Sequence, residues 1–496
     1  TDKLDNGIYA TDYAYNIRNW LTGIEGGKFS QSLHYTDGLG VPCYNGNISS
    51  MTWKSGAGAT PRGYKFSYDR LGRLTDAEYG EGPSLSVNTN RFNEQVTGYD
   101  KMGNILGLKR YGQTSATGYD VIDDLSLSYA GNRLKKVTDR STTPAFNNGF
   151  EFKDGIDLPT EYEYDENGNL TKDLNKNITA IQYNCLNLPS RVMFANGNSI
   201  SYLYDAAGRK LRTVHVLEGD SVTTDYCGNV VYENGVPQIL LTEVGYVSLT
   251  DGQYHYYLKD HQGNNRVVVD EEGTVEEVND YYAFGGLMST SSRQSVQPYK
   301  YNGKELDRKG GLDWYDYGAR MYDPVLGRWY AVDDLSEHYY YLSPYNYCMD
   351  NPANWVGPNG REPEITVDLP EVTIIGQKVM EPISGFWNAF GYYLFGRTIT
   401  LLMYGINNNS MSANPIGYLT YNVNKEGVVM GVAPIGGIAP TPSFTGLKMR
   451  QILQLLKAGR TMTKGGLTAV GRALKKHSDR SGSAFPKAVG NPTAIN

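Results

Sequence analysis

The sequence predicts a mainly β protein whose short strand-turn-strand units join into a large curved antiparallel sheet, followed by a smaller mixed or α-helical C-terminal region. Composition favours this fold class, because 57 glycines and 41 tyrosines among 496 residues suit glycine turns between aromatic strands. Repetition favours it further, since one short motif recurs between residues 68 and 267. Beside the motif, apolar and polar residues alternate with the period of a half-buried strand.

Each copy of the motif has an aspartate, a glycine three residues later, then arginine or asparagine, and then an apolar residue. The copies are YDRLGRL (68–74), YDKMGNI (99–105), YDENGNL (164–170) and YDAAGRKL (204–211), with the shorter relatives YAGNRL (129–134) and KDHQGNNRV (259–267). Aspartate at the first position and glycine at the fourth favour a type I turn. The aspartate caps the turn, and the glycine accepts the left-handed conformation that starts the returning strand. Hairpins this small are not stable alone, so we expect them to join into one long sheet.

The tyrosine of the motif has two interpretations. Exposed aromatic side chains along a sheet can bind carbohydrate. Alternatively, tyrosine packs across strands while aspartate serves the turn. The alternation at 162–164 and 202–204 suits either. The tyrosine-aspartate pair recurs at every turn, which favours packing. A repeated fold needs the pair at each turn, whereas a single binding site needs it once.

The net charge and the spacing of the cysteines and histidines argue against several classes of protein. The formal net charge of −7 argues against a dedicated nucleic-acid scaffold. The four cysteines contain no CxxC pair, and the six histidines contain no HExxH or similar ligand pair. We therefore expect no disulfide framework, no metal site and no cofactor.

At these motifs the chain resembles the RHS/YD-repeat family. The resemblance becomes specific at GLDWYDYGARMYDPVLGRWYAVDDLSEHYYYLSPYNYCMDNPANWVGPNG (311–360), which is similar to the RHS-repeat-associated core in the style of Bacteroidetes proteins. YNIRNWLTGI (15–24), YNGNISSMTW (44–53) and KYNGKELD (300–307) fit the same style, so the resemblance spans about residues 10–362.

The resemblance implies a wide β-sheet that spirals into a hollow cocoon, a core that plugs one end, and a variable C-terminal region, often a toxin, inside. We accordingly divide the chain into a YD/RHS-repeat β-shell (1–310), an autoprotease-like RHS core or plug (311–363), an enclosed linker with an apolar segment (364–444) and the N-terminal part of a toxin domain (445–496). A closed shell around a folded cargo needs more sheet than these short strands supply. We expect either the C-terminal part of a longer shell or an unusually small one.

In many family members the core holds two aspartates that share one proton and act like an aspartic protease dyad. The resemblance places the first at Asp333, where the following proline is replaced by Asp334, and the second at Gly357, which has no carboxylate. The family's arginine corresponds to Arg320 or Arg328. We therefore expect self-cleavage after the core to be impaired.

A structural role for these residues stays open. Asp333 can serve a turn while Arg320 and Arg328 pair with nearby carboxylates. Asp350 can in principle replace the missing partner, although no spacing argument supports it. Gly357 is either natural divergence or an introduced change that keeps the cargo attached.

Composition changes after Pro363. EITVDLPEVTIIGQK (364–378) predicts one or two extended segments. ISGFWNAFGYYLFGRTITLLMYGI (383–406) is apolar but interrupted by glycines, an asparagine and an arginine, which favours an enclosed segment over a stable membrane span. Residues 408–446 are rich in Asn, Gly, Pro and Ser, and predict loops with one or two short strands.

Residues 446–477 are basic, with apolar spacing that predicts an amphipathic helix ending at Gly459. GRALKKHSDRSGSAFPKAVGNPTAIN (471–496) resembles a segment of bacterial polymorphic toxin domains, usually nucleases, that ordinarily continues into further strands. We therefore expect a partly represented toxin domain, inert in this form. His477 can act as general acid or base on a ribose hydroxyl, with Lys476 and Arg480 stabilising the phosphate. The alternative is a solvated helix end whose cations favour the helix dipole.

The preferred hypothesis is an RHS-repeat toxin or effector that encloses a C-terminal nuclease and delivers it in competition between bacteria, for example by type VI secretion. Expected partners are an immunity protein, secretion-system or adaptor/chaperone proteins, and RNA or DNA as the target. The expected location is secreted, extracellular or on the cell surface before entry into a target cell. The alternative is a non-enzymatic adhesin or carbohydrate-binding repeat protein, which has no need of the motif at 471–496.

Overall fold

The computed structural model describes residues 2–4, 9–56, 59–292, 297–361, 363–365, 390–395, 398–405, 414–424 and 427–434. The chain divides into two compact units. The first comprises Thr1–Leu4, Ile8–Leu240 and Gly245–Val372, and the second comprises Asp5–Gly7, Leu241–Val244 and Thr373–Asn496.

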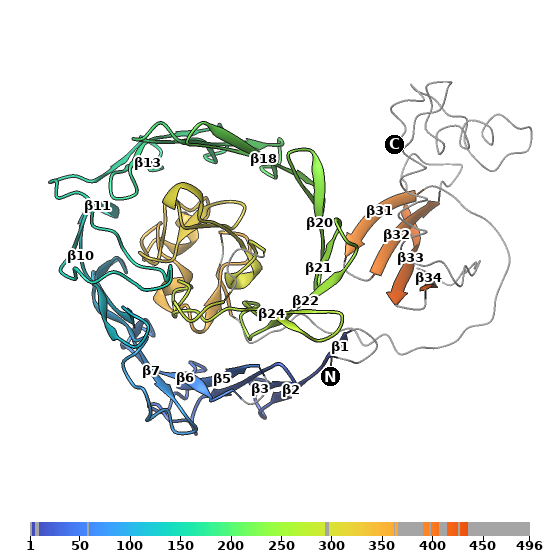
Figure 1. The fold of residues 1–496 in the computed structure, drawn as a ribbon, viewed down its shortest axis with the longest axis horizontal. Coiled ribbons are helices and arrows are strands. Elements are labelled where there is room, and N and C mark those ends of the chain that lie inside the picture. The colour runs from blue at the N-terminus through green and yellow to red at the C-terminus, as the bar shows by residue number, and fades with distance from the viewer. Residues whose placement is uncertain are drawn as a thin grey trace, which may run out of the picture. The chain divides into compact units, whose positions relative to one another are not determined.

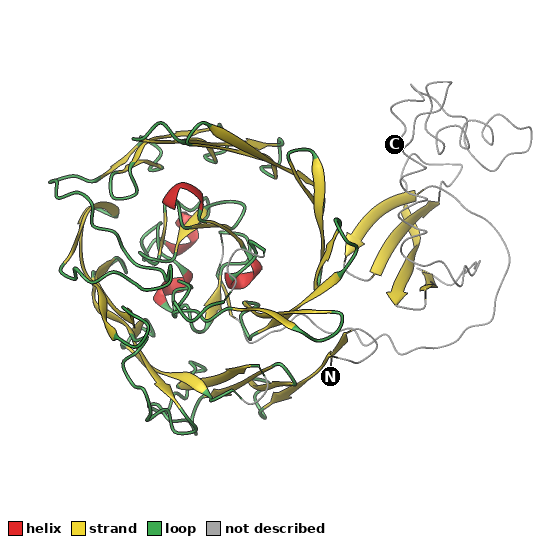
Figure 2. Ribbon diagram, in the orientation of Figure 1, coloured by secondary structure: helices red, strands yellow, loops and turns green. Residues whose placement is uncertain are grey.

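Antiparallel strands make up nearly all the regular structure of the described residues, which confirms the predicted mainly β fold (Figure 2). Helix in this part of the chain is limited to short 3-10 turns. These are η2 (Tyr301–Gly303), η3 (Lys309–Gly311), η4 (Ser336–Tyr339) and η5 (Cys348–Asp350).

The wall of the first unit consists of two sheets whose strands follow sequence order. The 11-stranded sheet contains β1 (Asp2–Leu4), β2 (Tyr9–Tyr15), β3 (Leu21–Gly26), β4 (Phe29–His34), β5 (Ser50–Ser55), β6 (Arg62–Tyr68), β7 (Leu74–Glu81), β8 (Glu94–Tyr99), β9 (Ile105–Gln113), β10 (Tyr119–Ala130) and β11 (Arg133–Asp139). The 13-stranded sheet contains β12 (Tyr162–Tyr164), β13 (Leu170–Asp173), β14 (Ile178–Tyr183), β15 (Pro189–Phe194), β16 (Ser199–Tyr204), β17 (Lys210–Leu217), β18 (Asp220–Cys227), β19 (Val230–Glu233), β20 (Val236–Thr242), β21 (Gly245–Ser248), β22 (Tyr254–Lys259), β23 (Asn265–Asp270) and β24 (Val275–Val278).

The wall is therefore not the single continuous sheet that the repeats predict. Residues 140–161 contain no strand and separate β11 from β12. This segment instead crosses to the interior of the unit, where the Phe150 amide donates to the Leu287 carbonyl at 2.9 Å and the Phe152 amide donates to Asp123 at 2.8 Å.

The repeated motif forms the predicted turns between neighbouring strands. In the first copy, Asp69 Oδ1 accepts from the amides of Leu71 and Arg73 at 2.9 and 3.0 Å, and the Gly72 amide donates to the Asp69 carbonyl at 3.0 Å. Gly72 has a φ of +80°, which favours glycine. The arginine of the motif also has a role, because Arg73 Nε donates to Asp69 Oδ2 at 2.7 Å.

The tyrosines of the motif tie each hairpin to an earlier one. Tyr68 donates its hydroxyl to the Ile48 carbonyl at 2.8 Å, and Tyr99 donates to the Leu74 carbonyl at 2.5 Å. Tyr129 makes the same kind of bond to Ile105 at 2.7 Å. These hydroxyls serve packing between repeats, which is the second of the two interpretations of the motif.

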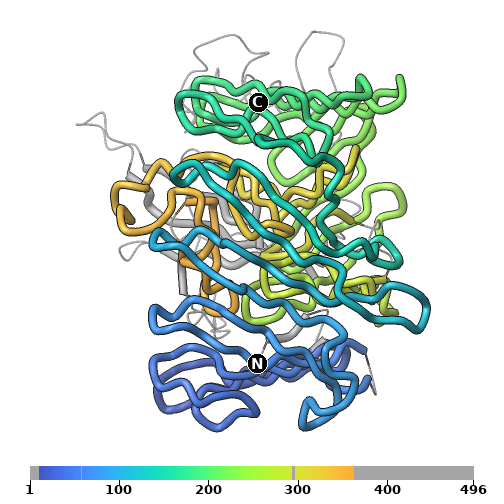
Figure 3. The backbone as a smooth tube through the Cα atoms, turned by 90° about the vertical axis from the view of Figure 1, so that its left-hand side faces the viewer, coloured from blue at the N-terminus to red at the C-terminus, as the bar shows by residue number. Residues whose placement is uncertain are grey.

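After β24 the chain leaves the wall and folds inside it. Figure 1 shows this core at the centre of the ring, and Figure 3 shows it between the first strands of the wall and the strands near residues 150–200. Its four-stranded sheet contains β25 (Glu305–Asp307), β26 (Trp314–Asp316), β27 (Met321–Asp323) and β28 (Arg328–Trp329), and β29 (Trp355–Val356) pairs with β30 (Glu364–Ile365).

Buried charged groups join core and wall. Arg110 on β9 donates to Glu94 at 2.6 Å, to Asp123 and to the Val325 carbonyl of the core. Glu94 also accepts from the Phe284 amide of the core at 2.9 Å. Separating these partners would leave a buried charge without its counter-charge, which costs free energy. The cluster therefore favours the one position of the core in which all of these bonds form.

The second unit contains a four-stranded antiparallel sheet. Its strands are β31 (Phe390–Phe395), β32 (Thr398–Gly405), β33 (Asn414–Asn424) and β34 (Gly427–Pro434). The apolar segment 383–406 thus contributes two strands, and 408–446 contains two strands longer than its composition predicts. Among the described residues, no helix is long and apolar enough to cross a bilayer.

Candidate proteolytic cavity in the core

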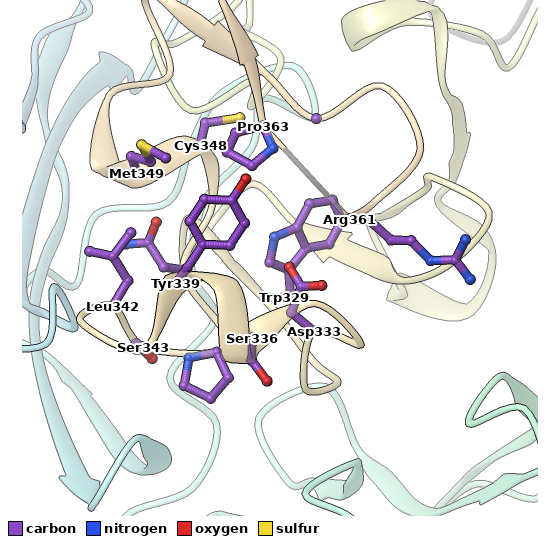
Figure 4. A pocket seen from close by; sticks show the side chains of 13 residues that line it. Trp329, Asp333, Ser336, Tyr339, Leu342, Ser343, Cys348, Met349, Arg361 and Pro363 are labelled. Carbon is purple, nitrogen blue, oxygen red and sulfur yellow. The ribbon is translucent and has the colours of Figure 1, made fainter.

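A small cavity in the core brings Asp333 and Gly357 together. Its volume is about 30 Å³, and both residues line it although 24 positions separate them in the numbering. Trp329 at the end of β28 provides an aromatic side, and Arg361 and Pro363 line it where the chain leaves the core. Figure 4 shows the Arg361 side chain pointing away from the other side chains that line the cavity.

Arg320 is the arginine that pairs with Asp333. Its Nη2 donates to Asp333 Oδ2 at 2.6 Å, and its guanidinium lies 4.4 Å from the centre of the Trp329 ring. Both charged side chains are buried, with 4% and 9% of Arg320 and Asp333 exposed. Burial lowers the pKa of Arg320 to about 10, although the charge of Asp333 opposes this shift. The guanidinium remains charged at neutral pH.

Arg320 also holds the backbone where the chain leaves the core. It donates from Nε to the Gly360 carbonyl at 2.5 Å and from Nη2 to the Arg361 carbonyl at 3.3 Å. A third bond runs from Nη1 to the Pro344 carbonyl at 3.1 Å. A cation donating to a peptide carbonyl withdraws electron density from it, which favours attack by a nucleophile at that carbon.

Asp333 has the contacts expected from the structural interpretation. Its Oδ1 accepts from the Leu335 amide at 2.9 Å, as expected of a turn residue, while Oδ2 pairs with Arg320. Its own amide donates to the Pro344 carbonyl at 3.2 Å. The carboxylate is therefore held in one orientation at the edge of the cavity.

Gly357 leaves room for a side chain. A Cβ placed there would lie 3.4 Å from Trp329 Cζ2 and 3.9 Å from Tyr347 Cε2, which are ordinary contact distances. Its backbone is outside the left-handed region, so a residue with a side chain meets no backbone strain. The position therefore has room for a Cβ, but the cavity now contains one carboxylate and cannot share a proton between two.

Arg328 and Asp350 lie elsewhere. Arg328 donates to the Asn132 carbonyl at 3.0 Å and lies over the rings of Tyr129 and Tyr345. Asp350 lines a separate cavity of about 10 Å³ together with Arg328. Burial raises the pKa of Asp350 well above its usual range. Asp350 therefore does not lie in position to replace the missing partner at 357.

Sequence reasoning missed part of this cavity. Cys348 and Met349 line it, and both have left-handed backbone conformations, with φ of +49° and +54°. Tyr339 on η4 lines it as well. No motif marks these side chains, because they reach the cavity through the turn at η5 and the loop around η4.

The toxin residues proposed from the sequence, His477, Lys476 and Arg480, lie outside the described residues. Within the described part of the chain, no cluster of three or more His, Cys, Asp or Glu side chains could hold a metal ion.

Comparison with known proteins finds one similar domain at the C-terminus and several relatives that match part of the chain. Residues 456–496 match the model of the CdiA C-terminal tRNase toxin domain. Toxin subunit YenC2 of Yersinia entomophaga is 34% identical over 105 residues, which are 20% of this chain and 10% of that protein. Toxin subunit YenC1 of the same organism is 29% identical over 189 residues, 36% of this chain and 17% of that protein.

Salivary gland surface protein 1 of Aedes aegypti is 29% identical over 224 residues, 40% of this chain and 6% of that protein. The chain thus matches only 6–17% of the length of these relatives. The crystal structure of TcdB2-TccC3-TEV aligns with a TM-score of 0.49 at 16% identity, over 71% of this chain and 19% of that one. The chain is therefore similar to a toxin domain over residues 456–496 and, over part of its length, to two toxin subunits.

Proposed function

We propose that this protein carries an RNA-cleaving C-terminal region for delivery into a target cell, in competition between bacteria. The observation that supports the proposal most directly is the match of residues 456–496 to a tRNase toxin domain. The similarity of part of the chain to toxin subunits supports a carrier role for the remainder of the protein. The proposed substrate is tRNA.

The proposed chemistry is attack of a ribose 2′-oxygen on the adjacent phosphorus. A base removes the 2′-hydroxyl proton, the 5′-oxygen leaves with a proton from an acid, and a cation stabilises the charge on the phosphate. His477 has a side chain that can serve as base or acid near neutral pH. Lys476 and Arg480 supply cations close to it in the sequence.

The test is expression of the whole toxin domain free of residues 1–363. Growth should stop, and the tRNA pool should show discrete fragments on a denaturing gel. His477→Ala should remove both effects, while Lys487→Ala, a basic residue of the same matched segment, should remove neither. An intact tRNA pool in arrested cells would reject tRNA as the substrate, and undiminished cleavage by the His477→Ala variant would reject His477 as a catalytic group.

An immunity protein is the proposed partner in the producing cell. The segment 446–477 is basic, so a small acidic protein is the expected partner by charge. Co-expression of the gene immediately downstream should restore growth to cells that make the free toxin domain. Continued arrest would exclude that gene product as the immunity protein.

We also propose that the core cavity is a self-cleaving site without its second acid. In such a site one carboxylate takes a proton from water, the water oxygen attacks the peptide carbon, and the other carboxyl gives a proton to the departing amine. Asp333 beside Arg320, the bonds of Arg320 to the Gly360 and Arg361 carbonyls, and the room at Gly357 support this proposal.

Restoring the acid tests it. Gly357→Asp should yield two fragments separated near residues 360–363, identified by mass spectrometry, while the unmodified chain stays intact. Gly357→Asn is the matched control, because its side chain has the same size and no acid. Addition of Asp333→Asn to Gly357→Asp should abolish the cut. An uncut Gly357→Asp chain would reject the proposal, and cleavage of the unmodified chain would show that another residue completes the site.

A non-enzymatic surface protein is the second candidate. The similarity to a salivary gland surface protein favours it. However, Tyr68, Tyr99 and Tyr129 use their hydroxyls in bonds to backbone carbonyls rather than presenting them for a ligand. Binding of residues 1–363 to cells or to a glycan array would support this second function, and absence of binding would reject it.

A further inference from the structure

Two turns of the wall contact the core segment that contains Asp333. The first is the turn Asp100–Asn104 between β8 and β9, in the 11-stranded sheet. A Cβ at Gly103 would lie 2.6 Å from Asp350 Oδ2 and 3.2 Å from Asn346 Nδ2. The core therefore packs so closely against this turn that any side chain at 103 would displace Asp350.

The second turn is Asp165–Asn169 between β12 and β13, in the 13-stranded sheet. A Cβ at Gly168 would lie 2.6 Å from Val332 Cγ2 and 2.8 Å from the Tyr345 hydroxyl. Val332 immediately precedes Asp333. The core thus meets one turn from each of the two sheets.

Hydrogen bonds fix both contacts. The Ser343 amide donates to the Met102 carbonyl of the first turn at 2.7 Å. At the second turn, the Tyr345 hydroxyl donates to the Gly168 carbonyl at 2.7 Å, and the Leu170 amide donates to the Tyr330 carbonyl at 2.9 Å. Ser343 also lines the cavity with Asp333, so one residue belongs both to the contact with the first turn and to the lining of the cavity.

The backbone beside the first contact is strained. Cys348, Met349 and Asp350 have φ of +49°, +54° and +60°, three consecutive residues in the left-handed region without a glycine. Such a conformation costs free energy and persists only where surrounding contacts impose it. Asp350 at one end lies against Gly103, and Cys348 at the other end lines the cavity.

We propose that the turns Asp100–Asn104 and Asp165–Asn169 act as positioning elements, so that the cavity around Asp333 forms only when both sheets have closed on the core. The consequence for self-cleavage rests on the proposed function. With an acid at 357, cleavage would be confined to a chain whose wall is already folded. Gly103 and Gly168 act through Asp350 and Val332 rather than on the reacting atoms.

Three alanine substitutions separate docking from turn strain. Gly103→Ala and Gly168→Ala add a methyl group that meets core atoms, at φ of +82° and +84°. Gly208→Ala is the matched control, because it has a φ of +80° in the same motif and its Cβ would meet only Leu188 and Leu186 of the wall, at 3.2 and 3.7 Å. All three impose the same backbone strain, but only the first two disturb the core.

The first readout needs no cleavage. Cys348 is 4% exposed and lines the cavity, so its reaction with a thiol reagent reports opening of the cavity. The other three cysteines, Cys43, Cys185 and Cys227, are first replaced by serine so that only Cys348 reacts. In the otherwise unmodified full chain, Gly103→Ala and Gly168→Ala should react about tenfold faster than the parent, the factor for a local opening made easier by ~1.4 kcal/mol. Gly208→Ala should react like the parent.

A rescue variant tests the contact itself. Asp350→Ala removes the carboxylate that the new methyl group would meet, so Gly103→Ala/Asp350→Ala should react more slowly than Gly103→Ala alone. Tyr345→Phe, which removes the bond to the Gly168 carbonyl, gives an independent variant if the alanine variants do not fold, as judged by circular dichroism. It should also speed the reaction of Cys348. Equal reaction rates in the core-contacting and the control variants, or no rescue, would overturn the proposal.

The second readout is cleavage in the Gly357→Asp chain. Gly103→Ala and Gly168→Ala should slow it in proportion to the fraction of chains that they remove from the competent state, with an unchanged pH profile, while Gly208→Ala leaves the rate unchanged. If the Gly357→Asp chain does not cleave at all, the proposed self-cleaving site is wrong, and Cys348 reactivity still decides the positioning role. If it cleaves equally fast in all variants, the positioning role is wrong and the self-cleaving site stands.

Discussion

At the scale of single residues, Arg320 shows how one buried cation can organise a site. It donates to one carboxylate and to the carbonyls of Gly360, Arg361 and Pro344, and it lies over Trp329. A guanidinium suits this place because its donors form a planar fork that can bind several acceptors at once. A lysine has the charge but not the fork.

Replacing Arg320 should therefore destabilise the core. Arg320→Gln leaves the buried Asp333 without its cation, and we expect the free energy of unfolding to fall by about 3–5 kcal/mol. Arg361→Gln is the control, because the Arg361–Asp334 pair is about half exposed and its loss should change stability by less than ~0.5 kcal/mol. Urea denaturation of both variants checks the difference, and equal midpoints would show that Arg320 is not a structural centre.

Asp173 gives the fold a dependence on pH. It lies on β13 in contact with Tyr330 of the core, and both Lys176 and Asp323 are near it. Burial, with a smaller contribution from the charge of Asp323, raises its pKa to about 6 against the opposing effect of Lys176. Because the folded pKa lies above that of the unfolded chain, its stabilising contribution is complete below about pH 4 and is lost as the pH rises through about 6.

The Asp173→Asn variant isolates this contribution. The asparagine cannot ionise, so the parent should gain about 1–2 kcal/mol of stability relative to the variant when the pH falls from 7.5 to 5. Unfolding curves in urea at the two pH values measure the gain. Parallel pH profiles for parent and variant would contradict the assignment.

At the scale of elements, the turn motif explains why so many short strands stay in register. In the copy at 69–73 the aspartate accepts two amide bonds and one side-chain bond, so residues within the turn itself close it. The register of β6 and β7 shifts between Ser67 and Tyr68, directly before this turn. The resulting bulge turns Tyr68 toward the Ile48 carbonyl of a neighbouring hairpin.

Removing the aspartate of one turn should weaken that hairpin. Asp69→Ala loses three hydrogen bonds, and we expect a decrease of about 2 kcal/mol in unfolding free energy together with faster amide exchange in β6 and β7. Asp120→Ala, which loses one local bond to the Val121 amide on an exposed position, should cost much less. Equal losses in the two variants would mean that the turn bonds contribute little.

At the scale of the first unit, the core is one of the links between the two sheets, which also contact each other directly, as where the His261 amide donates to Gln31 Oε1 at 3.0 Å. The strand-free segment 140–161 connects them along the chain, whereas Ser343 and Tyr330 connect them through space, by bonds to Met102 and Leu170. The buried cluster around Arg110 adds a further link between wall and core. The core therefore acts as a structural centre as well as the place of the candidate site.

A cut between the sheets tests this arrangement. A protease site inserted between Gly155 and Ile156, in an exposed part of the connecting segment, should be cleaved without separating the two pieces. Both pieces should elute together on size exclusion with the parent's circular dichroism spectrum. Separation without denaturant would show that the covalent connection, rather than the core, holds the sheets together.

The sequence by itself determined the strand-turn-strand repeat and the mainly β fold, and its resemblance to a known family made Asp333 and Gly357 candidates. The repeat and the fold class follow from local interactions, because a turn is closed by residues four positions apart and a strand is recognised by its alternation. Only the tertiary structure decided that the sheet divides at 140–161, that Arg320 rather than Arg328 pairs with Asp333, and that Asp350 faces another cavity. Those outcomes depend on contacts between residues far apart in the chain, such as Gly103 with Asp350, and no local pattern encodes such a distance.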